Sequence, residues 1–235
     1  RFLNEHADDF LNHVADRSGV LILDSRDCEA MAEAEGYRGR YNNALPNLYN
    51  ALLHIGIRAE VCNLRQIREG ILDGAKALFI PFRPYVDPWM EKVLRRFVEN
   101  GGALIAESPF ALKGSCGIHY EVTPGGMTDL FGDLGKLPGS DCGGIPAFDF
   151  RAEMEVAAGT VEARFADGAP AVVSHAYGKG RTVLYASQLS MAYQIERPFY
   201  PNDVPVLSWE QAGPFRRELA KQLEKSGILP KWRIS

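Results

Sequence analysis

The first half of the chain alternates short apolar runs with stretches of helical periodicity. Residues 20–24, 77–81 and 103–107 are apolar at nearly every position, and residues 57–63 alternate apolar with polar side chains. Apolar runs of this length, hydrophobic on both faces, are typical of central strands in a parallel sheet. The sequence therefore predicts four parallel strands at these positions.

Helical patterns separate these predicted strands. Apolar residues recur at helical spacing over 41–54, at Leu45, Leu48, Leu52 and Leu53. Asp87 followed by Pro88 predicts the N-cap and first position of a second helix, which runs to Asn100. A short helix or turn is expected over 67–72, and further helices over 2–14 and 213–226. This order of strands and helices predicts a doubly wound α/β sheet.

The pattern changes after Glu107. Residues 108–150 are rich in Gly and Pro, with one expected helix over 126–131. Residues 153–187 are expected to form antiparallel strands, because 166–169 and 178–180 have the composition of tight turns between extended runs. We therefore expect a lead-in helix at 1–14, an α/β domain at 15–190 that includes this antiparallel extension, and an irregular tail with a terminal helix at 191–235.

The composition excludes several classes of function. The chain has 46% hydrophobic and 24% charged residues, a net charge of −4 and a pI of about 5.8. A nucleic-acid partner is not expected, because the sequence has neither a basic stripe nor a known binding module. No apolar run approaches the roughly 20 residues that cross a bilayer, so no membrane span is expected. The chain begins at Arg1 rather than Met, which leaves room for a preceding part of the protein.

Cysteine and histidine spacing does not indicate a metal site or a cofactor. The four cysteines are far apart with no CxxC pair, and the five histidines form no HxH or HExxH motif. Cys62 alternates with apolar residues and is expected to be a small buried side chain. Scattered single cysteines of this kind favour a reducing compartment, such as the cytoplasm.

Polar side chains follow the predicted strands at their carboxyl ends. In open α/β sheets, crevices form beyond this edge. We expect a shared rim formed by Asp24, Arg26, Arg83, Tyr85, Glu107 and Ser108. One interpretation is structural, with Asp24 capping its loop and pairing with Arg83. The alternative is a vestigial or partner-contacting face; a nucleotide site is not expected, because neither GxGxxG nor GxxxxGKS is present.

Four stretches together resemble the trimerisation domain of family 42 glycoside hydrolases, the β-galactosidases built around a TIM barrel. They are the run 20–24 after its lead-in helix, the helix, Gly and strand of 49–61, the strand 77–82 with the later 97–105, and the closing hairpin of 165–173 and 177–181. The resemblance covers about residues 10–190. It implies a flavodoxin-like fold of the class I glutamine-amidotransferase type.

The same resemblance implies an assembly domain without catalytic residues. In the family the two catalytic glutamates lie on the barrel, and nothing in this sequence matches a barrel. The expected partners are therefore further copies of the chain, as in a trimer, and a catalytic barrel absent from it. Segment 193–209, rich in aromatic residues, is a candidate contact surface. The sequence does not identify the sugar or the linkage.

The alternative hypothesis is a stand-alone amidotransferase-like hydrolase. Such enzymes place a nucleophilic Cys on the turn after a buried strand. Here that turn carries Glu107, Ser108 and Pro109 instead. Cys116 and His119 offer a second candidate pair, in a segment expected to be a flexible loop. Proximity in sequence supplies neither hydrogen-bond reach nor an orienting third group.

Overall fold

The computed structural model describes residues 18–28, 38–81, 83, 86–108, 118–122, 145, 152–156, 159–193 and 209–230. The helices expected over 2–14 and 126–131 lie outside these ranges, as do Tyr85, Cys116 and most of segment 193–209.

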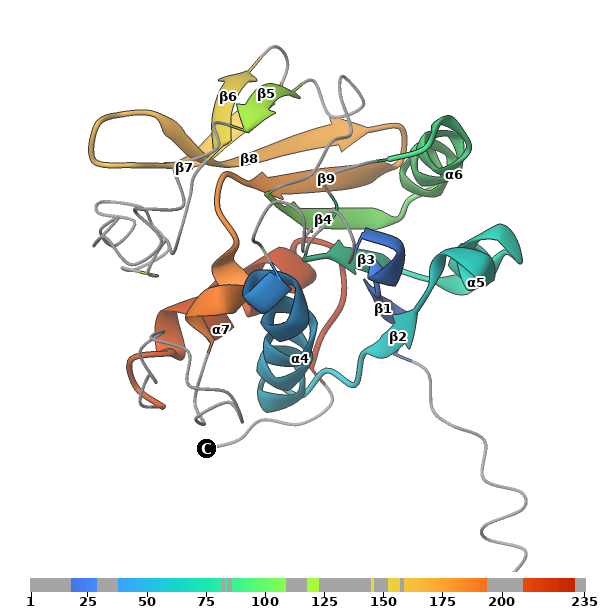
Figure 1. Cartoon of the computed structure of the whole chain (residues 1–235), viewed down its shortest axis with the longest axis horizontal. Coiled ribbons are helices and arrows are strands. Elements are labelled where there is room, and N and C mark those ends of the chain that lie inside the picture. Colours follow the sequence, from blue (N-terminus) through green and yellow to red (C-terminus); the bar gives the residue numbers. More distant parts are fainter. Residues whose placement is uncertain are drawn as a thin grey trace, which may run out of the picture.

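A seven-stranded sheet forms the centre of the molecule, in the order β2-β1-β3-β4-β9-β8-β7 (Figure 1). Its parallel strands are β1 (Val20–Leu23), β2 (Glu60–Cys62), β3 (Ala77–Ile80), β4 (Ala103–Glu107) and β9 (Gly180–Tyr185). Strands β8 (Pro170–Tyr177) and β7 (Thr160–Arg164) continue it antiparallel. The expected α/β fold, with four parallel strands and an antiparallel extension, is confirmed.

Two features of the sheet differ from the expectation. Residues 182–186, expected in the antiparallel extension, contribute most of β9, which is antiparallel to β8 but parallel to β4. The hairpin after β8 turns the chain back beside β4, so the extension joins the main sheet directly. In addition, β5 (Ile118–Val122) pairs antiparallel with β6 (Ala152–Val156) in a separate two-stranded sheet. From the sequence we assign no element to 118–122, although its apolar and polar residues alternate.

Helices cover both faces of the sheet. They are α4 (Arg38–His54), α5 (Leu64–Arg68), α6 (Pro88–Glu99) and α7 (Gly213–Glu224), with 3-10 turns η1 (Arg26–Cys28), η2 (Ile71–Gly74) and η4 (Leu189–Ala192). Right-handed crossovers in this strand order place α4 on one face and α5 and α6 on the other. Helix α7 contacts α4 and lies with it (Figure 1).

Local sequence explains how the helices begin and which faces they bury. In α5, the side chain of Asn63 accepts from the backbone of Gln66, and the side chain of Gln66 accepts from the backbone of Asn63, a reciprocal capping box. Helix α6 begins with Pro88 after the N-cap Asp87, as expected. In α4, Leu48 and Leu52 are buried as expected, whereas Leu53 is exposed. The buried stripe of α4 instead combines these two leucines with Ala44 and Ala51.

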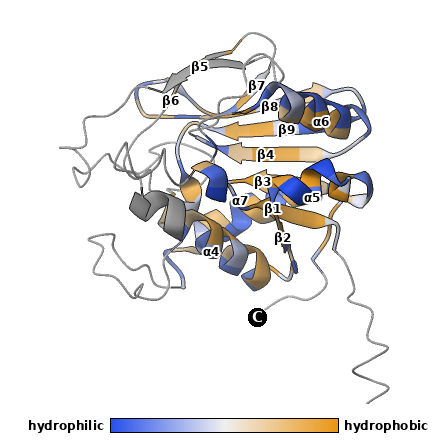
Figure 2. Ribbon diagram, turned by 45° about the vertical axis from the view of Figure 1, so that its right-hand side comes forward, coloured by the Kyte–Doolittle hydropathy of each residue, from blue (hydrophilic) through white to orange (hydrophobic). Residues whose placement is uncertain are grey.

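The core lies on both faces of the sheet. Strands β1, β3 and β4 are buried at every position, which explains their continuous apolar character (Figure 2). Strand β2 is at the sheet edge, and its Val61 is 44% exposed. Cys62 is buried and free, as expected, and burial raises the pKa of its thiol to about 12. Among the described helices, none combines the length and apolar character that crossing a bilayer requires.

Candidate functional site

The carboxyl ends of the parallel strands meet at one edge of the sheet, and we refer to this region as the carboxyl edge. Ser25 follows β1, Arg83 follows β3, Glu107 ends β4 and Ser108 comes next, and Gln188 follows β9. Because these strands are neighbours in the sheet, residues far apart in the sequence are brought together there. Of the expected rim residues, all but Tyr85 are described.

Arg83 is at the centre of this edge and is completely buried. Its Nη1 donates to Oδ1 of Asp27 at 2.7 Å, whereas Asp24 pairs with Arg26 at 3.3 Å. The interpretation that Arg83 pairs with Asp24 was therefore wrong. Burial acts to lower the pKa of Arg83, but the hydrogen bond and charge of Asp27 outweigh it and the pKa is raised. Asp27 was not singled out in the sequence because its role depends on η1, which points it toward β3.

Several polar atoms at the carboxyl edge are buried without a partner. Nε and Nη2 of Arg83, Oε1 of Gln188 and Oγ of Ser25 form no hydrogen bond in the structure as described. Gln188 is held beside the segment that leads from β3 to Arg83, because its Nε2 donates to the carbonyl oxygen of Pro81 at 3.0 Å. Gln188 was missed in the sequence, since nothing in its local pattern marks it.

Glu107 is buried beneath η4 rather than exposed on a turn. Its carboxylate accepts from the backbone N–H of Ser190 at 3.0 Å and from the Ser190 hydroxyl at 2.6 Å. Burial raises the pKa of Glu107 to about 8, although both bonds from Ser190 act to lower it. The next residue, Ser108, is fully buried and donates its hydroxyl to the carbonyl of Tyr185 at 2.9 Å. Neither side chain presents a nucleophile to solvent.

Of the second candidate pair, Cys116 and His119, the structure describes only His119. Cys116 lies outside the described residues. His119 is in strand β5, opposite Glu155 of β6, rather than in a flexible loop. No group of three or more His, Cys, Asp or Glu side chains in the described residues is arranged to hold a metal ion.

Two carboxylates, Glu162 on β7 and Glu218 on α7, lie close together because both accept from Nε2 of Gln222, at 3.1 and 2.7 Å. Lys225 donates to Glu162 at 2.9 Å, and Tyr185 donates to Glu218 at 3.0 Å. Burial acts to raise the pKa of Glu162, but hydrogen bonds, that from Lys225 first, lower it to about 2. A general acid in glycoside hydrolysis needs a raised pKa. Glu162, with its lowered pKa, does not meet this requirement. Through Gln222, the two carboxylates instead attach α7 to β7.

A cavity of about 370 Å³ lies between the end of α4 and α7. It is lined by His54, Ile55, Trp209, Arg216, Arg217, Ala220, Glu224, Leu229 and Pro230. The guanidinium of Arg216 stacks 3.5 Å from the ring centre of Trp209. Trp209 is 37% exposed and Leu229 68% exposed, so apolar surface continues around the opening.

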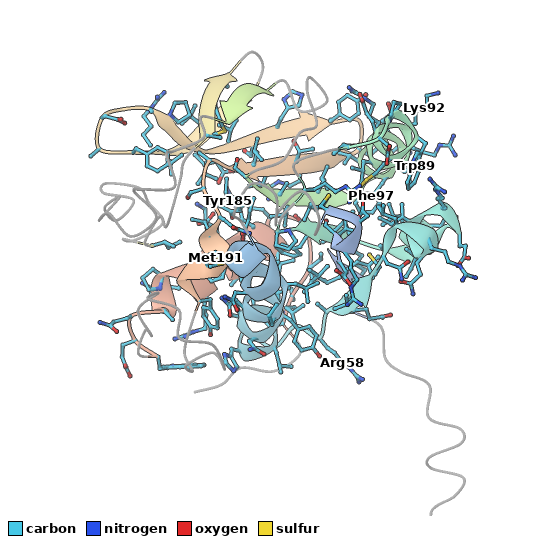
Figure 3. The ribbon with its side chains drawn as sticks, in the orientation of Figure 1. Arg58, Trp89, Lys92, Phe97, Tyr185 and Met191 are labelled. Atoms are coloured by element: carbon cyan, nitrogen blue, oxygen red, sulfur yellow. The ribbon has the colours of Figure 1, made fainter. Side chains whose placement is uncertain are left out.

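Segment 193–209 contributes differently at its two ends. Tyr193 is buried in its own domain, with its hydroxyl 2.8 Å from Nδ1 of His54 and 3.2 Å from Nη1 of Arg216. The figure shows the neighbouring Tyr185 and Met191 on the side of the sheet where α4 and α7 lie (Figure 3). The expectation of a contact surface is therefore wrong for Tyr193, and for Trp209, the other described residue of this segment, it stays a prediction.

Comparison with curated proteins finds two β-galactosidases. The chain is 27% identical over 196 residues to β-galactosidase YesZ of Bacillus licheniformis, covering 72% of this chain and 27% of that protein. It is 28% identical over 176 residues to YesZ of Bacillus subtilis, covering 68% and 26%. The chain thus spans about a quarter of the length of these relatives. No family model matches it.

Solved structures show the same fold. Gan42B, a GH42 β-galactosidase from G. stearothermophilus, superposes with a TM-score of 0.66 at 20% identity, over 92% of this chain and 31% of that one. A β-galactosidase from Bacillus circulans gives 0.66 at 14% identity, over 97% and 34%. Together, these matches show that the chain is similar in sequence to two β-galactosidases and shares its fold with about a third of a GH42 β-galactosidase.

Proposed function

We propose that this chain is a non-catalytic assembly domain of a β-galactosidase-type glycoside hydrolase, whose catalytic barrel lies outside these 235 residues. The observation that carries the proposal is the extent of the match. The α/β fold here aligns over 92% of its length with about a third of a GH42 β-galactosidase. The buried thiol of Cys62, which forms no disulfide, agrees with a cytoplasmic location, which is part of the proposal.

The chemistry of the described carboxylates supports a non-catalytic role. Retaining glycosidases need two carboxyl groups about 5 Å apart, one of them a proton donor that reaches the substrate. Glu107 has a raised pKa but is buried against Ser190, and Glu162 is held ionised by Lys225. Asp27 is bound to Arg83. Each of these acids is engaged in contacts within the fold.

The surface around the α4–α7 cavity supports self-association, and we assign it to contact with another copy of the chain. Trp and Arg are enriched at the centres of protein interfaces. Here Trp209, stacked by Arg216, lines the same cavity as the exposed Leu229. Arg217 and Glu224 line the same cavity, and this pair of opposite charges suits a surface that meets its own copy.

The proposal is tested on the natural protein that contains this chain. We expect the intact protein to be a homo-oligomer by light scattering after size-exclusion chromatography, and deletion of this domain to leave a smaller species. We expect the chain alone not to hydrolyse nitrophenyl galactoside, because it lacks a barrel that positions two carboxylates. Turnover by the chain alone, abolished by replacing one of its own acids, would contradict the proposal.

A surface variant locates the contact. Trp209→Ala combined with Leu229→Asp should shift the oligomer toward the monomer, because it removes an aromatic anchor and places a charge in the interface. Val61→Asp is the matched control, since Val61 is similarly exposed but lies on the edge strand β2. An unchanged mass in the double variant, or an equal loss in the control, would show that this surface is not the contact.

A further inference from the structure

We propose that Arg83 binds a small oxyanion, of the carboxylate or phosphate type, at the carboxyl edge of the sheet. The site lies at the carboxyl edge, away from the surface proposed for self-association, so the inference does not depend on the role in assembly. It rests on the arrangement of donors and acceptors around one fully buried guanidinium.

The guanidinium of Arg83 uses only part of its hydrogen-bonding capacity. Nη1 donates to Asp27 at 2.7 Å, and no described group accepts from Nε or Nη2. These two nitrogens lie on the same edge of the planar group, so their N–H bonds are parallel. That edge matches two oxygens of one carboxylate or phosphate, the bidentate geometry for which arginine is suited. The structure thus leaves a complete bidentate edge without a protein acceptor among the residues described.

Burial makes this arrangement costly unless a ligand completes it. Arg83 is 0% exposed, and a buried donor without an acceptor loses its hydration without replacement. Buried polar groups in native proteins are almost always paired with protein, ordered water or an ion. An anion fits better than neutral water, because two donors of a cation converge in parallel. Glu107, which ends the adjacent strand β4, adds little opposing charge at neutral pH because its pKa is raised to about 8.

The neighbouring polar atoms define the rest of the ligand. Oε1 of Gln188 is an acceptor with no donor in the structure as described, and Oγ of Ser25 can both donate and accept. Gln188 is fixed toward β3 by its bond to Pro81. An oxyanion that also carries a hydroxyl group would satisfy Arg83 with its oxygens and Gln188 with its proton. A hydroxycarboxylate and a hydrogen phosphate both meet this requirement.

The position in the fold agrees with a binding site. The strand order reverses at β1, so the chain leaves β1 toward α4 on one face and leaves β3 toward α6 on the other. In open α/β sheets the crevice at such a reversal, beyond the carboxyl ends of the strands, is where ligands bind. Ser25 lies two residues after β1 and Arg83 three residues after β3.

The test is a titration of the full chain followed by the NMR signal of the Arg83 Nε–H group, which reports on the proposed contact itself. The probes are inorganic phosphate, glycolate and the neutral glycolamide, at constant ionic strength. We expect a saturable shift with phosphate or glycolate, and binding of glycolamide weaker by about tenfold or more, because it lacks the charge. Phosphate and glycolate distinguish a tetrahedral from a planar anion.

Two variants distinguish binding to the bidentate edge of Arg83 from a general attraction of anions to positive charge. Arg83→Lys keeps the charge but removes the bidentate edge, and should weaken binding about tenfold or more. Arg95→Lys, at an arginine paired with Glu91 on α6, is the matched control and should leave binding unchanged. If Arg83→Lys does not fold, Ser25→Ala should still weaken binding in an otherwise intact protein. The proposal is overturned if neither anion gives a saturable shift, or if the Arg83 or Ser25 variant binds as the wild type does.

Discussion

Glu107 ends a fully buried strand, and its carboxyl group contacts Ser190 of η4 rather than water. Burial disfavours the charged form more than the two bonds from Ser190 favour it, so the pKa is raised from 4.5 to about 8. An acidic residue at the end of a strand was readily noticed in the sequence. Its chemical state depends on the segment packed over it, which comes from a position more than 80 residues later.

This environment predicts an unusual dependence of stability on pH. Because the folded-state pKa of Glu107 lies above the unfolded value, the folded protein binds more protons between pH 4.5 and 8. The contribution of Glu107 to stability is therefore most favourable below pH 4.5 and is lost as pH rises through 8. Glu107→Gln should remove this loss. The free energy of unfolding of the variant, minus that of the wild type, should therefore increase from pH 5 to pH 9 when both are measured by urea denaturation.

The matched control for this experiment is Glu224→Gln, because Glu224 is an exposed glutamate near the end of α7. Its difference from the wild type should stay constant over the same pH range. A constant difference for Glu107→Gln as well would show that Glu107 titrates normally.

At the scale of elements, the β8–β9 hairpin is seated against the end of α6. The backbone N–H of Lys179, in the hairpin turn, donates to the carbonyl of Glu99 at 3.0 Å. Gly180 begins β9 directly beside this helix end, and a Cβ atom there would overlap the carbonyl oxygens of Val98 and Gly102. The hairpin glycines were identified as turn residues from sequence alone. The need for a bare backbone at Gly180 comes from the helix packed against it.

We expect Gly180→Ala to destabilise the protein by about 1–3 kcal/mol, because backbone atoms rather than flexible side chains must move. The measurement is the free energy of unfolding in urea. Gly74→Ala is the matched control, since a Cβ at Gly74 meets nothing within 4 Å and the residue is not in the left-handed region. Equal stability of the two variants would contradict the packing argument.

At the scale of the whole molecule, α7 closes the fold by bonding to strands from both parts of the sheet. Gln222 of α7 accepts from Arg181 of β9 at 2.9 Å and donates to Glu162 of β7 at 3.1 Å. Arg181 and Glu162 also pair directly, at 3.3 Å. The carboxyl-terminal helix is thus joined to the antiparallel strands and to the last parallel strand at once.

Glu162 makes this connection sensitive to acid. Its folded-state pKa of about 2 lies below the ordinary 4.5, so its contribution is present above pH 4.5 and is lost as pH falls toward 2. Glu162→Gln should lower the free energy of unfolding by about 2–3 kcal/mol at pH 7. The difference from the wild type should shrink between pH 4.5 and 2, with Glu99→Gln, at the exposed Glu99, as the control. A deficit of Glu162→Gln that is the same at pH 3 as at pH 7 would refute this assignment.

The sequence by itself determined the elements and much of the fold class. Periodicity is a local property, so the strands at 20–24, 77–81 and 103–107 and the helix from Pro88 were predicted within a few residues of their observed bounds. Continuous apolar runs also carried the information that these strands are buried on both faces. The carboxyl edge could be predicted as a meeting place of polar side chains, because parallel strands end together.

Only the tertiary structure decided how these elements and side chains pair. The direction of β9 depends on the hairpin returning beside β4, and local composition does not contain that information. Arg83 pairs with Asp27 rather than Asp24 because η1 turns one carboxylate toward it and leaves the other beside Arg26. Hydrogen bonds and ion pairs between residues far apart in the chain require distances of a few ångströms, and the packing of the elements against one another sets these distances.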